Sequence, residues 1–383
     1  MSPLPPAAPV KLLLVGPCPP PHGGISVHVA TARRLLTRAG ARCRVLDAGG
    51  HRSGGPWGRL ASFVRLLGDT RRSAADGWTL HLHTNGHNPR SWLLALACGL
   101  AARRAPGRVL TLHSGMVPDY LATAPGWGRA LARRALRQYG RVLCVNQRIA
   151  EALAALGVDP GAGRSRLEVV PAYLPAPPAS GAPFAAGLEA RLEAHVEAWL
   201  AGRSPVLSTI LFFRPEYGFE VLLGALARLA PRHPGLGCLV LGSGEGEAAA
   251  RRLVRDRGLE ERVRLLGDVP HELCLALMAR SDLFVRPTLV DGDALSVREA
   301  LALGLPVVAS DAGFRPSGVE LFPAGDAGAL AARIEALVAS PRETAAAATG
   351  PAPTAPAAAD DPAAGGGLEA LLRAYREVAC AAP

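Results

Sequence analysis

The sequence predicts an α/β protein of two units, each a doubly wound parallel sheet with helices on both faces. Short apolar runs, typical of buried parallel strands, alternate with longer helical patterns along most of the 383 residues. The alternation stops in the Pro- and Ala-rich stretch 175–183 and then begins again. A chain of this length is comfortable for two domains, and 49% of its residues are hydrophobic, which is ample for two cores.

The first unit is expected over residues 1–175, beginning with a Pro-rich tail. Its expected strands are 11–15, 43–46, 79–83, 109–113, 142–145 and 167–171, and its expected helices are 25–39, 91–102, 126–139 and 149–156. The loop after the first strand ends in Gly23 and Gly24. A glycine pair that opens a helix lets a ligand approach the main chain, although a plain tight turn explains it equally well.

The second unit is expected over residues 184–340. Its expected strands are 206–213, 238–241, 263–266, 283–285 and 306–310, and its expected helices are 188–200, 219–230, 247–257, 270–279, 295–303 and 327–339. A low-complexity linker, 341–366, precedes an amphipathic final helix, 368–379. We expect the functional site in a cleft between the two units, at the carboxyl ends of both sheets.

The charge is unevenly distributed. Residues 1–175 hold 23 Lys+Arg and 7 Asp+Glu, a net charge of +16, whereas residues 176–383 hold 19 and 25, a net charge of −6. A basic first half suggests an anionic partner, such as a membrane surface or a lipid phosphate. Nucleic acid is not expected, because the basic residues are not interleaved with aromatic ones and no recognition motif is present.

Two Arg-rich segments supply much of this charge: Arg59, Arg65, Arg71 and Arg72, and Arg129, Arg133, Arg134 and Arg137. They are either solvated helix faces or a docking surface for an anionic membrane. No apolar run reaches the ~18 residues of a membrane span, and the run 12–15 is too short for a signal-peptide core. The seven cysteines are scattered singly, which favours reduced buried thiols. We expect a cytoplasmic protein, with peripheral attachment to the inner membrane face left open.

The stretch 282–311 is expected to contain the site. It is predicted to form a strand, a polar turn, a helix that begins near Leu295, and a second strand. A turn that feeds a helix N-terminus at the carboxyl end of a parallel strand is where open α/β sheets bind anions. Asp291 and Glu299 bracket this turn. From the residues alone, Asp291 and Asp293 are equally suited to cap the helix.

Residues 204–311 resemble the second domain of the family-4 retaining glycosyltransferases, which have the two-Rossmann GT-B fold. The resemblance is carried by the following segments: Gly242-Ser243-Gly244, Arg262 to Gly267, Ser281 to Val285, and, most specifically, Glu299-Ala300-Leu301 leading to Gly304 through Asp311. The first half is similar more loosely, through Gly23-Gly24 and Thr111 to Gly115. The resemblance implies two Rossmann-like domains that face each other across a cleft. It also implies that the helix 368–379 crosses back to the first domain.

The resemblance also implies residue roles. Glu299 would accept hydrogen bonds from the ribose of a nucleotide-sugar. Asp291, where the family has Glu, would contact the donor sugar near the reacting carbon. His113 matches a family position near that sugar, although a lone strand-end His is often structural. The main-chain N–H groups at the helix start would hold the distal phosphate, and glycine loops would approach the donor. These residues are Ala294, Leu295, Ser296, Gly23, Gly24, Gly242 and Gly244.

The main departure from the family is the loss of two cations that hold the donor diphosphate. Phe212 and Tyr217 stand where the family has Arg and Lys. Arg214, Arg286 and Arg298 are the candidate replacements, because a guanidinium can bind phosphate through two hydrogen bonds. For Arg298, a solvated helix face is an equally good interpretation.

His81, His83 and His87 have spacings that suggest a metal site. However, no Cys, Asp or Glu lies close by in the sequence, and the fold that the resemblance implies needs no metal. We therefore expect no metal and no cofactor.

These observations predict a retaining transferase that moves a hexosyl unit from a nucleotide-diphospho-sugar to an acceptor hydroxyl. The acceptor would be a glycan, a lipid-linked sugar or a small molecule. A weakly active GT-B binding or assembly subunit is the first alternative, because two cations are missing. A GT-B sugar-nucleotide epimerase is the second.

Overall fold

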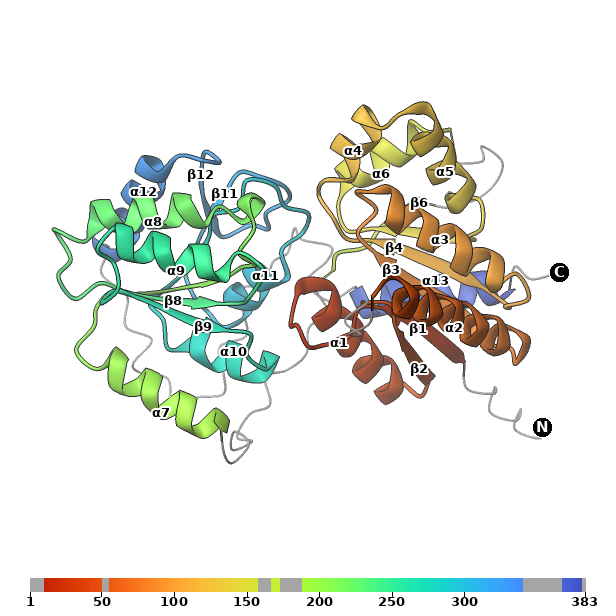
Figure 1. Ribbon diagram of the computed structural model, residues 1–383, viewed down its shortest axis with the longest axis horizontal. Helices are drawn as coiled ribbons and strands as arrows, with labels where there is room; N and C mark the ends of the chain where they lie inside the picture. Colours follow the sequence, from red (N-terminus) through yellow and green to blue (C-terminus); the bar gives the residue numbers. More distant parts are fainter. Residues whose placement is uncertain (1–9, 50–54, 158–166, 173–187, 340–366, 381–383) are drawn as a thin grey trace, which may run out of the picture. The chain divides into compact units, whose positions relative to one another are not determined.

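The computed structural model describes residues 10–49, 55–157, 167–172, 188–339 and 367–380. They form two compact units, each built on a parallel sheet flanked by helices (Figure 1). The first unit contains the described residues up to 172, except the segment 20–24, together with 367–380. The second contains 188–339, with which the segment 20–24 is grouped. The expected Pro-rich tail and both expected linkers lie outside the described residues.

The sheet of the first unit has the strand order β2-β1-β3-β4-β5-β6, and all neighbours are parallel. The strands are β1 (Lys11–Gly16), β2 (Arg42–Asp47), β3 (Thr79–Thr84), β4 (Arg108–Leu112), β5 (Arg141–Cys144) and β6 (Leu167–Val169). The order reverses between β1 and β3. Ligands of doubly wound sheets bind outside the carboxyl ends of the strands at such a point.

The four central strands of this sheet, β1, β3, β4 and β5, are buried on both faces because successive side chains alternate between two cores. Leu13 and Val15 of β1 enter one core, while Leu12 and Leu14 enter the other. The helices around the sheet are α1 (Gly24–Arg38), α2 (Pro56–Ala75), α3 (Pro89–Ala101), α4 (Val117–Thr123), α5 (Gly126–Leu136), α6 (Gln147–Ala154) and α13 (Gly367–Cys380).

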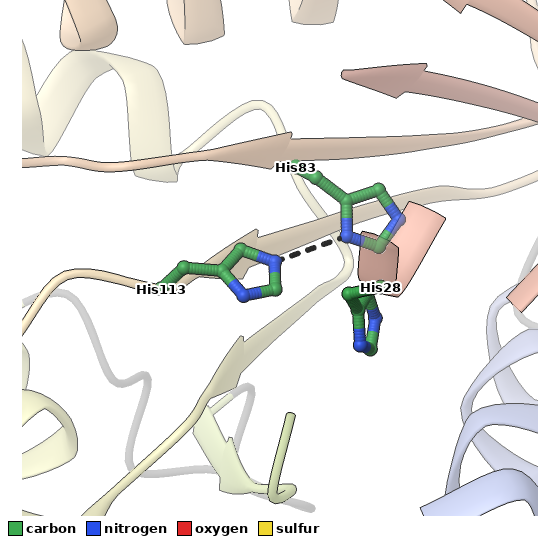
Figure 2. Close-up of side chains that lie close together, drawn as sticks. All are labelled: His28, His83 and His113. Atoms are coloured by element: carbon green, nitrogen blue, oxygen red, sulfur yellow. Dashed lines mark hydrogen bonds between the residues drawn. The ribbon is translucent and has the colours of Figure 1, made fainter. Parts of the chain in front are cut away.

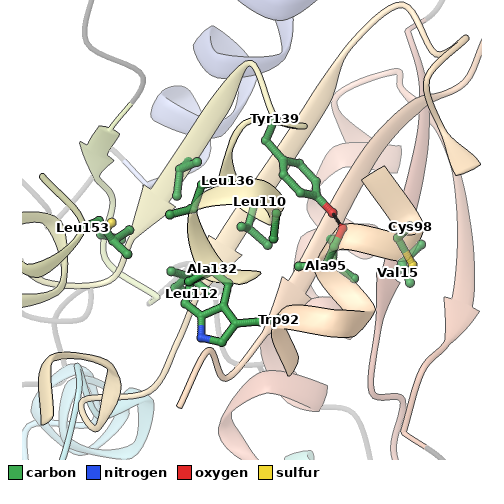
Figure 3. Packing of buried hydrophobic residues seen from close by; sticks show 14 of the residues in the cluster. Val15, Trp92, Ala95, Cys98, Leu110, Leu112, Ala132, Leu136, Tyr139 and Leu153 are labelled. Atoms are coloured by element: carbon green, nitrogen blue, oxygen red, sulfur yellow. Dashed lines mark hydrogen bonds between the residues drawn. The ribbon is translucent and has the colours of Figure 1, made fainter. Parts of the chain in front are cut away.

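The core under α3 and α5 is packed around Trp92, Leu110 and Tyr139 (Figure 3). The hydroxyl of Tyr139 donates a hydrogen bond of 2.6 Å to the carbonyl oxygen of Ala95, so its polar end is satisfied inside the core. The side chain of Asn88 caps α3 by accepting from the N–H of Ser91, which fixes where the helix begins.

The opposite core is closed by α1 and by the final helix, α13. Leu371, Ala374, Tyr375 and Val378 of α13 are buried in it. The guanidinium of Arg141 also donates a 3.0 Å hydrogen bond to Glu377. The last helix of the chain therefore completes the first unit.

The sheet of the second unit has the order β12-β11-β10-β7-β8-β9, again all parallel. The strands are β7 (Val206–Ile210), β8 (Gly237–Leu241), β9 (Val263–Gly267), β10 (Leu283–Arg286), β11 (Val307–Ser310) and β12 (Val319–Phe322). The helices are α7 (Leu188–Leu200), α8 (Phe219–Leu229), α9 (Glu247–Asp256), α10 (His271–Ala279), α11 (Leu295–Ala302) and α12 (Ala327–Ala339). This is the strand order of a dinucleotide-binding Rossmann sheet, and it reverses between β7 and β10.

Four elements were not predicted: α2, α4, β12 and the short 3-10 helix Pro215–Tyr217. In α2, only Leu66, Thr70, Ser73 and Ala74 are buried, whereas Trp57 is 82% exposed. Its apolar residues therefore do not form the core-facing stripe that reveals a helix in a sequence. The strand expected to reach residue 213 ends at Ile210. No helix in the described part of the chain is both long and apolar enough to cross a bilayer.

Candidate active site

The turn between β10 and α11 lies at the point where the second sheet reverses its strand order. Arg286 is the last residue of β10, and α11 begins at Leu295. β10 pairs with β7 through Leu283 and Phe284, so the chain segments that follow these two strands leave the same edge of the sheet. The residues predicted to hold the donor diphosphate therefore lie at the edge where this class of sheet binds its ligands.

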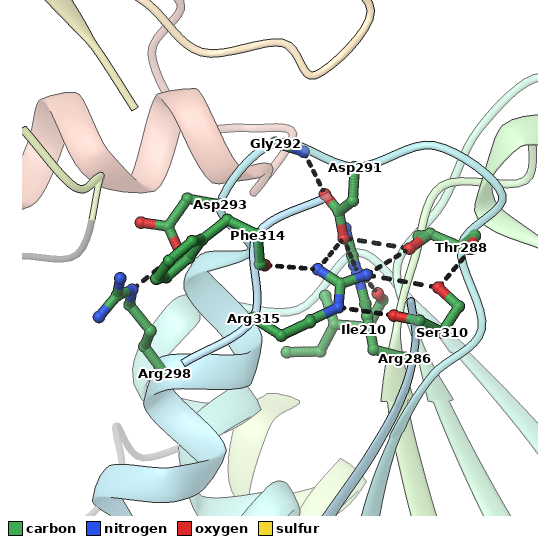
Figure 4. A network of polar contacts seen from close by, with 10 residues as sticks. All are labelled: Ile210, Arg286, Thr288, Asp291, Gly292, Asp293, Arg298, Ser310, Phe314 and Arg315. Atoms are coloured by element: carbon green, nitrogen blue, oxygen red, sulfur yellow. Dashed lines mark hydrogen bonds and ion pairs between the residues drawn. The ribbon is translucent and has the colours of Figure 1, made fainter. Parts of the chain in front are cut away.

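A carboxylate held between two guanidinium groups forms the centre of this turn (Figure 4). Asp291 Oδ2 accepts hydrogen bonds from Arg286 Nε at 2.9 Å and from Arg315 Nη1 at 3.1 Å. The hydroxyl of Thr288 and the N–H of Gly292 also donate to this carboxylate. The side chains of Arg286, Asp291 and Arg315 are only 10%, 11% and 4% exposed, so the cluster is largely withdrawn from water.

The cluster keeps Asp291 ionised. Burial by itself would raise the pKa of the Asp291 carboxyl, but the charges of Arg286 and Arg315 and the hydrogen bonds to the carboxylate outweigh it, so the pKa is lowered. Burial likewise disfavours the charged form of Arg286, yet Asp291 outweighs it, and the pKa of Arg286 is raised. Two guanidinium groups share one carboxylate, so this cluster carries an excess positive charge.

The hydrogen bonds of Asp291 and Arg286 differ from those that their expected roles imply. Asp291 was expected to face the sugar as a carboxylate of its own, but both of its oxygens accept hydrogen bonds within the protein. Arg286 donates to Asp291 through Nε and Nη2 and to the carbonyl oxygen of Ile210 through Nη1. Its three nitrogens are thus all bonded inside the unit, so any direct contact with a phosphate would compete with these bonds. Arg315 was not singled out from the sequence, because it lies beyond the motif that drew attention.

Tyr217 and Phe212 occupy the two positions where cations were expected. The guanidinium carbon of Arg286 lies 5.3 Å from the centre of the Tyr217 ring, a cation–π distance. The rings of Tyr217 and Phe212 meet edge to face at 5.7 Å. Arg214, the third candidate cation, is exposed and lies 5.8 Å from the Phe212 ring centre. Tyr217 therefore packs against a buried cation at one of the two positions where the resemblance places a cation.

The N-terminus of α11 is not capped by a side chain. Its N-cap residue is Ala294, which makes no side-chain cap. The interpretation that Asp291 and Asp293 cap this helix is therefore wrong. Asp291 serves the two guanidinium groups, and Asp293 Oδ1 accepts a 2.8 Å hydrogen bond from Arg298. The first turn, with Leu295 and Ser296, retains the positive end of the helix dipole, and binding of an anion there stays a prediction.

Arg298 is buried rather than solvated. Its side chain is 5% exposed and that of Asp293 is 0% exposed. The guanidinium carbon of Arg298 also lies 5.3 Å from the ring centre of Phe314. The expected alternative of a solvated helix face is therefore wrong, and the pairing with Asp293 gives Arg298 a structural role in holding the turn on α11.

Glu299 lies on α11 and is bonded to a histidine from the neighbouring helix. His271 Nε2 is 2.6 Å from Glu299 Oε1, and the Glu299 side chain is 9% exposed. His271 is the first residue of α10. This pair was not predicted, because the two residues are 28 positions apart and belong to different helices.

Gly242 and Gly244 have a structural reason to be glycine. Their φ angles are +126° and +153°, a region that other residues rarely adopt. A Cβ atom on Gly242 would also lie 1.9 Å from the carbonyl oxygen of Leu211. The loop after β8 thus packs tightly on the chain after β7. Contact of these glycines with the donor stays a prediction.

In the first unit, His113 follows β4 and does not stand alone. Its Nε2 lies 3.2 Å from Nδ1 of His83, and its ring centre lies 5.0 Å from that of His28. Burial and the neighbouring imidazoles hold the pKa of His113 well below its usual value, so the ring is neutral near pH 7. Gly23 and Gly24 end the loop after β1, and α1 begins at Gly24. Their contact with a donor stays a prediction.

The three histidines first considered for a metal do not form a group. His81 is bonded through both ring nitrogens, to Tyr375 at 2.6 Å and to Thr111 at 2.7 Å. His87 Nδ1 lies 2.7 Å from the hydroxyl of Ser114. Of the three, His83 alone contributes to the histidine group around His113.

Known proteins share this fold along most of the chain. The UDP-glucose complex of HepE from Anabaena covers 86% of this chain and 90% of its own, with 18% identity and a TM-score of 0.61. Sucrose-phosphate synthase from Thermosynechococcus elongatus covers 97% and 96%, with 19% identity and a TM-score of 0.63. Two Rossmann-like parallel-sheet units of this kind are the GT-B fold, which this chain shares with these structures.

Family models match both units. Residues 9–172 match the glycosyl transferase 4-like domain, and residues 196–350 match glycosyl transferases group 1. The chain belongs to the group 1 glycosyltransferases and is a transferase.

Curated relatives are glycosyltransferases of several kinds. A GDP-mannose-dependent α-(1-6)-phosphatidylinositol monomannoside mannosyltransferase from Mycolicibacterium smegmatis is 29% identical over 65% of this chain and 65% of its own. The amylovoran biosynthesis glycosyltransferase AmsK from Erwinia amylovora is 37% identical over 24% of this chain and 26% of its own. The chain spans between about a quarter and two thirds of the length of these relatives.

Proposed function

We propose that the protein transfers a hexosyl unit, with retention of anomeric configuration, from a nucleotide-diphospho-sugar to an acceptor hydroxyl. The reaction would serve the synthesis of a glycan, a polysaccharide or a glycolipid. The observation that carries this proposal is the buried cluster of Arg286, Asp291 and Arg315 beside the uncapped start of α11.

The cluster supports transfer through its charge. When the sugar leaves, negative charge develops on the diphosphate, and preorganised positive charge in a site withdrawn from water stabilises it. Asp291 neutralises only one of the two guanidinium groups, and a buried excess charge favours an anionic partner. The N–H groups of Leu295 and Ser296 would make the direct contacts, while Arg286 and Arg315 act from behind the turn.

The same arrangement supports transfer without a metal ion or cofactor. In many transferases a divalent cation offsets the charge of the leaving diphosphate. Here two guanidinium groups and the positive end of a helix dipole are present at the turn to do so. Metal-independent transfer is therefore part of the proposal.

The bonding of Asp291 bears on the mechanism of retention. A double displacement needs a carboxylate that can attack the anomeric carbon. Asp291 accepts hydrogen bonds on both oxygens and pairs with two guanidinium groups, which lowers its nucleophilicity. We therefore assign Asp291 the role of positioning the turn, and the transfer is a front-face departure and attack. His113, as a neutral imidazole, would orient the sugar.

The donor end of the proposal is supported by Glu299. Its carboxylate accepts from His271 and is oriented by it, as a carboxylate that binds two ribose hydroxyls has to be. Structures similar to this chain include complexes with UDP and UDP-glucose. The curated relatives include GDP-mannose-dependent enzymes. Uridine and guanosine diphosphate-sugars are therefore the first donors to examine.

The experiment combines donor binding with turnover. A panel of UDP- and GDP-sugars is titrated by calorimetry, and turnover of the bound donor with a mixture of acceptors is followed by mass spectrometry. Arg315→Ala is expected to lower turnover by about 100-fold, the scale of losing one preorganised charge contact. Glu299→Ala is expected to abolish donor binding. Arg333→Ala is the matched control, because Arg333 forms an exposed pair with Glu320 in the same unit.

Three outcomes would change the proposal. Unchanged turnover in Glu299→Ala would remove the assignment of the donor site. A product with inverted anomeric configuration, measured by proton NMR before anomers equilibrate, would exclude retention. Turnover of the donor in the absence of any acceptor would identify an epimerase instead. The alternative of a weakly active subunit predicts no donor binding across the whole panel.

A membrane surface is the acceptor environment that the first unit supports best. On α2, Trp57, Leu60 and Val64 are 82%, 51% and 60% exposed and follow helical spacing. Arg59, Arg65, Arg71 and Arg72 on the same helix are exposed as well. Apolar side chains beside exposed arginines are typical of a helix that lies on an anionic bilayer. On α5, by contrast, Arg129 and Arg133 donate to the carbonyl oxygens of Ala124 and Leu156.

A further inference from the structure

Three histidines from separate elements of the first unit converge at the carboxyl edge of its sheet (Figure 2). His28 lies on α1, His83 on β3 and His113 directly after β4. One ring nitrogen from each lies within 4.8 Å of the other two. This is the point where the sheet reverses its strand order between β1 and β3, so the fold itself brings the three residues together.

Two of the three rings have a buried nitrogen that no group in the described chain satisfies. Nε2 of His28 and Nε2 of His83 are withdrawn from solvent and have no hydrogen-bond partner in the protein. Such a nitrogen raises the free energy of the folded state unless a water molecule or an ion fills its open position. His28 is only 4% exposed and His83 is 0% exposed. An ion held by Nδ1 of His83 would fill the open position at Nε2 of His28 but not that at Nε2 of His83, so Nε2 of His28 is the nitrogen that points to an ion.

The tautomer of His28 is fixed by its other nitrogen. Nδ1 lies 2.5 Å from the carbonyl oxygen of Ala172, and because a carbonyl can only accept, Nδ1 carries the hydrogen. The neutral ring therefore presents a lone pair at Nε2. A metal-bound histidine typically donates its second N–H to such an oxygen, which orients the ring. His28 thus has the bonding of a ligand before any ion is present.

The remaining pair can supply two more nitrogens. Nδ1 of His83 and Nε2 of His113 lie 3.2 Å apart, close to the separation of about 3.3 Å between two nitrogens of a tetrahedral zinc site. Because the nitrogens of the group lie within 4.8 Å of one another, one ring has to move by up to about 1.5 Å to bring all three to bonding distance of one ion. His113 is partly exposed, so an ion can enter from its side.

The chemistry of the three imidazole ligands restricts which metal ions can bind. The group contains three imidazoles and no carboxylate, and imidazole suits zinc, copper, nickel and iron rather than calcium or magnesium. His81, whose ring centre is 3.9 Å from that of His83, is bonded at both nitrogens and is therefore not a fourth ligand.

We propose that His28, His83 and His113 bind one zinc-like divalent ion and leave a fourth coordination position open. The site lies in the first unit, so binding of the ion does not depend on the function proposed for the turn between β10 and α11. Only its effect on transfer rests on the role proposed for His113. Because His113 is also assigned to the sugar, a bound ion would displace that contact and slow transfer. The ion would therefore act on the enzyme as an inhibitor, while the transfer itself proceeds without a metal.

The experiment measures binding directly. Tag-free full-length protein is stripped with a chelator and titrated with Zn²⁺ in competition with a chromophoric chelator, which reports stoichiometry and affinity. Co²⁺ is then used as a spectroscopic probe. Intense visible absorption without a thiolate-to-metal charge-transfer band indicates four-coordinate binding by nitrogen and oxygen, and excludes binding by cysteine. We expect one ion per chain and a rise in thermal unfolding temperature with added Zn²⁺.

Variants locate the site. His83→Asn and His113→Ala are each expected to weaken Zn²⁺ binding by on the order of 100-fold or more, a loss at least as large as that from an outer-shell change. His195→Gln is the control, because His195 is an exposed histidine on α7 of the second unit. Unfolding curves without metal show which variants are folded, and the exposed edge at His113 makes His113→Ala the variant that tolerates change best. Absence of a saturable single site, or equal Zn²⁺ affinity in wild type and His113→Ala, overturns the proposal.

Discussion

Arg315 and Asp291 form an ion pair of 3.1 Å although Asp291 is already paired with Arg286. Arg315 lies in the turn after β11 and Asp291 in the turn after β10, so the shared carboxylate ties two turns of the second unit together. The hydroxyl of Thr288 contacts both Asp291 and Arg315, at 3.1 Å in each case. The shape of the turn between β10 and α11 therefore depends on a residue outside the motif by which this turn is identified.

The two partners of this ion pair are expected to differ in their effect on stability. Asp291→Ala leaves two buried guanidinium groups without a carboxylate, and we expect a loss of about 3–5 kcal/mol in the free energy of unfolding. Arg315→Ala is expected to cost clearly less, because the pair of Arg286 and Asp291 remains intact. Urea unfolding of both variants is the measurement. An equal or larger loss of unfolding free energy in Arg315→Ala would contradict the expectation that the pair of Arg286 and Asp291 remains stable without Arg315.

The contribution of Asp291 is expected to depend on pH. Its pKa is lowered in the folded state, since Arg286 and Arg315 outweigh the effect of burial. A carboxyl of this kind stabilises the protein above its unfolded pKa of about 3.9 and loses that contribution as the pH falls through its folded value. The stability difference between wild type and Asp291→Asn should therefore be constant above about pH 5 and shrink below about pH 4. A difference that grows in acid would contradict the pairing.

Tyr217 offers a test of whether the family cation can be restored. Tyr217→Lys would place an ammonium group near Arg286, which the Tyr217 ring now covers at 5.3 Å. We expect a loss of about 1–2 kcal/mol, because a cation–π contact is replaced by repulsion between like charges. Tyr217→Phe keeps the ring and serves as the control. If Tyr217→Lys instead binds the donor more tightly without loss of stability, the turn has room for a third cation.

His271 is expected to act on the donor through Glu299. Its hydrogen bond of 2.6 Å fixes one oxygen of that carboxylate. His271→Ala should raise the KM for the donor by about 10-fold, since hydrogen bonds to a charged group contribute about 1.5–3 kcal/mol, while kcat changes little. His271→Gln, which can still donate, should recover part of the loss. Steady-state kinetics with varied donor decide the matter: a fall in kcat at constant KM would place His271 in the chemical step instead.

The exposed apolar face of α2 predicts binding to anionic vesicles. A double variant, Trp57→Ser with Leu60→Ser, is expected to lose most binding to vesicles that contain phosphatidylglycerol, because it removes the side chains that would enter the bilayer. Trp127→Ser is the matched control, since Trp127 is 62% exposed on α5. Co-sedimentation at low and at high salt separates the apolar from the charged contribution to vesicle binding, because salt screens the charged one. Equal binding of both variants would remove α2 as the docking surface.

Much of the fold was accessible from the sequence, because parallel strands buried on both faces are short apolar runs between helices. The alternation of strands and helices in both units was predicted, and the GT-B class is confirmed by the structural neighbours. The amphipathic helix α2 was not predicted, because its exposed Trp57 and Leu60 break the pattern that marks a core-facing helix. A helix is recognised in a sequence when its apolar residues recur along one core-facing side. A helix that also has exposed apolar residues on another side lacks this clear pattern.

The site was predicted less completely than the fold. Asp291, Arg286 and Glu299 lie close together between the end of β10 and α11, but their bonding was not foreseen and their role in donor binding stays a prediction. Arg315 and His271 reach the site from other turns and helices, and no local spacing connects them to it. The same holds for His28, which meets His83 and His113 only through the topology of the sheet. Contacts between distant segments are settled by packing, so a single sequence carries little sign of them.

The bond between Tyr375 and His81 has a consequence for how the chain is made. These residues are 294 positions apart, and Tyr375 belongs to the helix that closes one face of the first sheet. A ribosome has therefore synthesised all of the second unit before the first can bury that face. We expect the fragment 1–175 to be unstable when expressed alone and to be rescued by adding the helix 367–380 as a separate peptide. Folding of the second unit would precede completion of the first, the reverse of their order in the sequence.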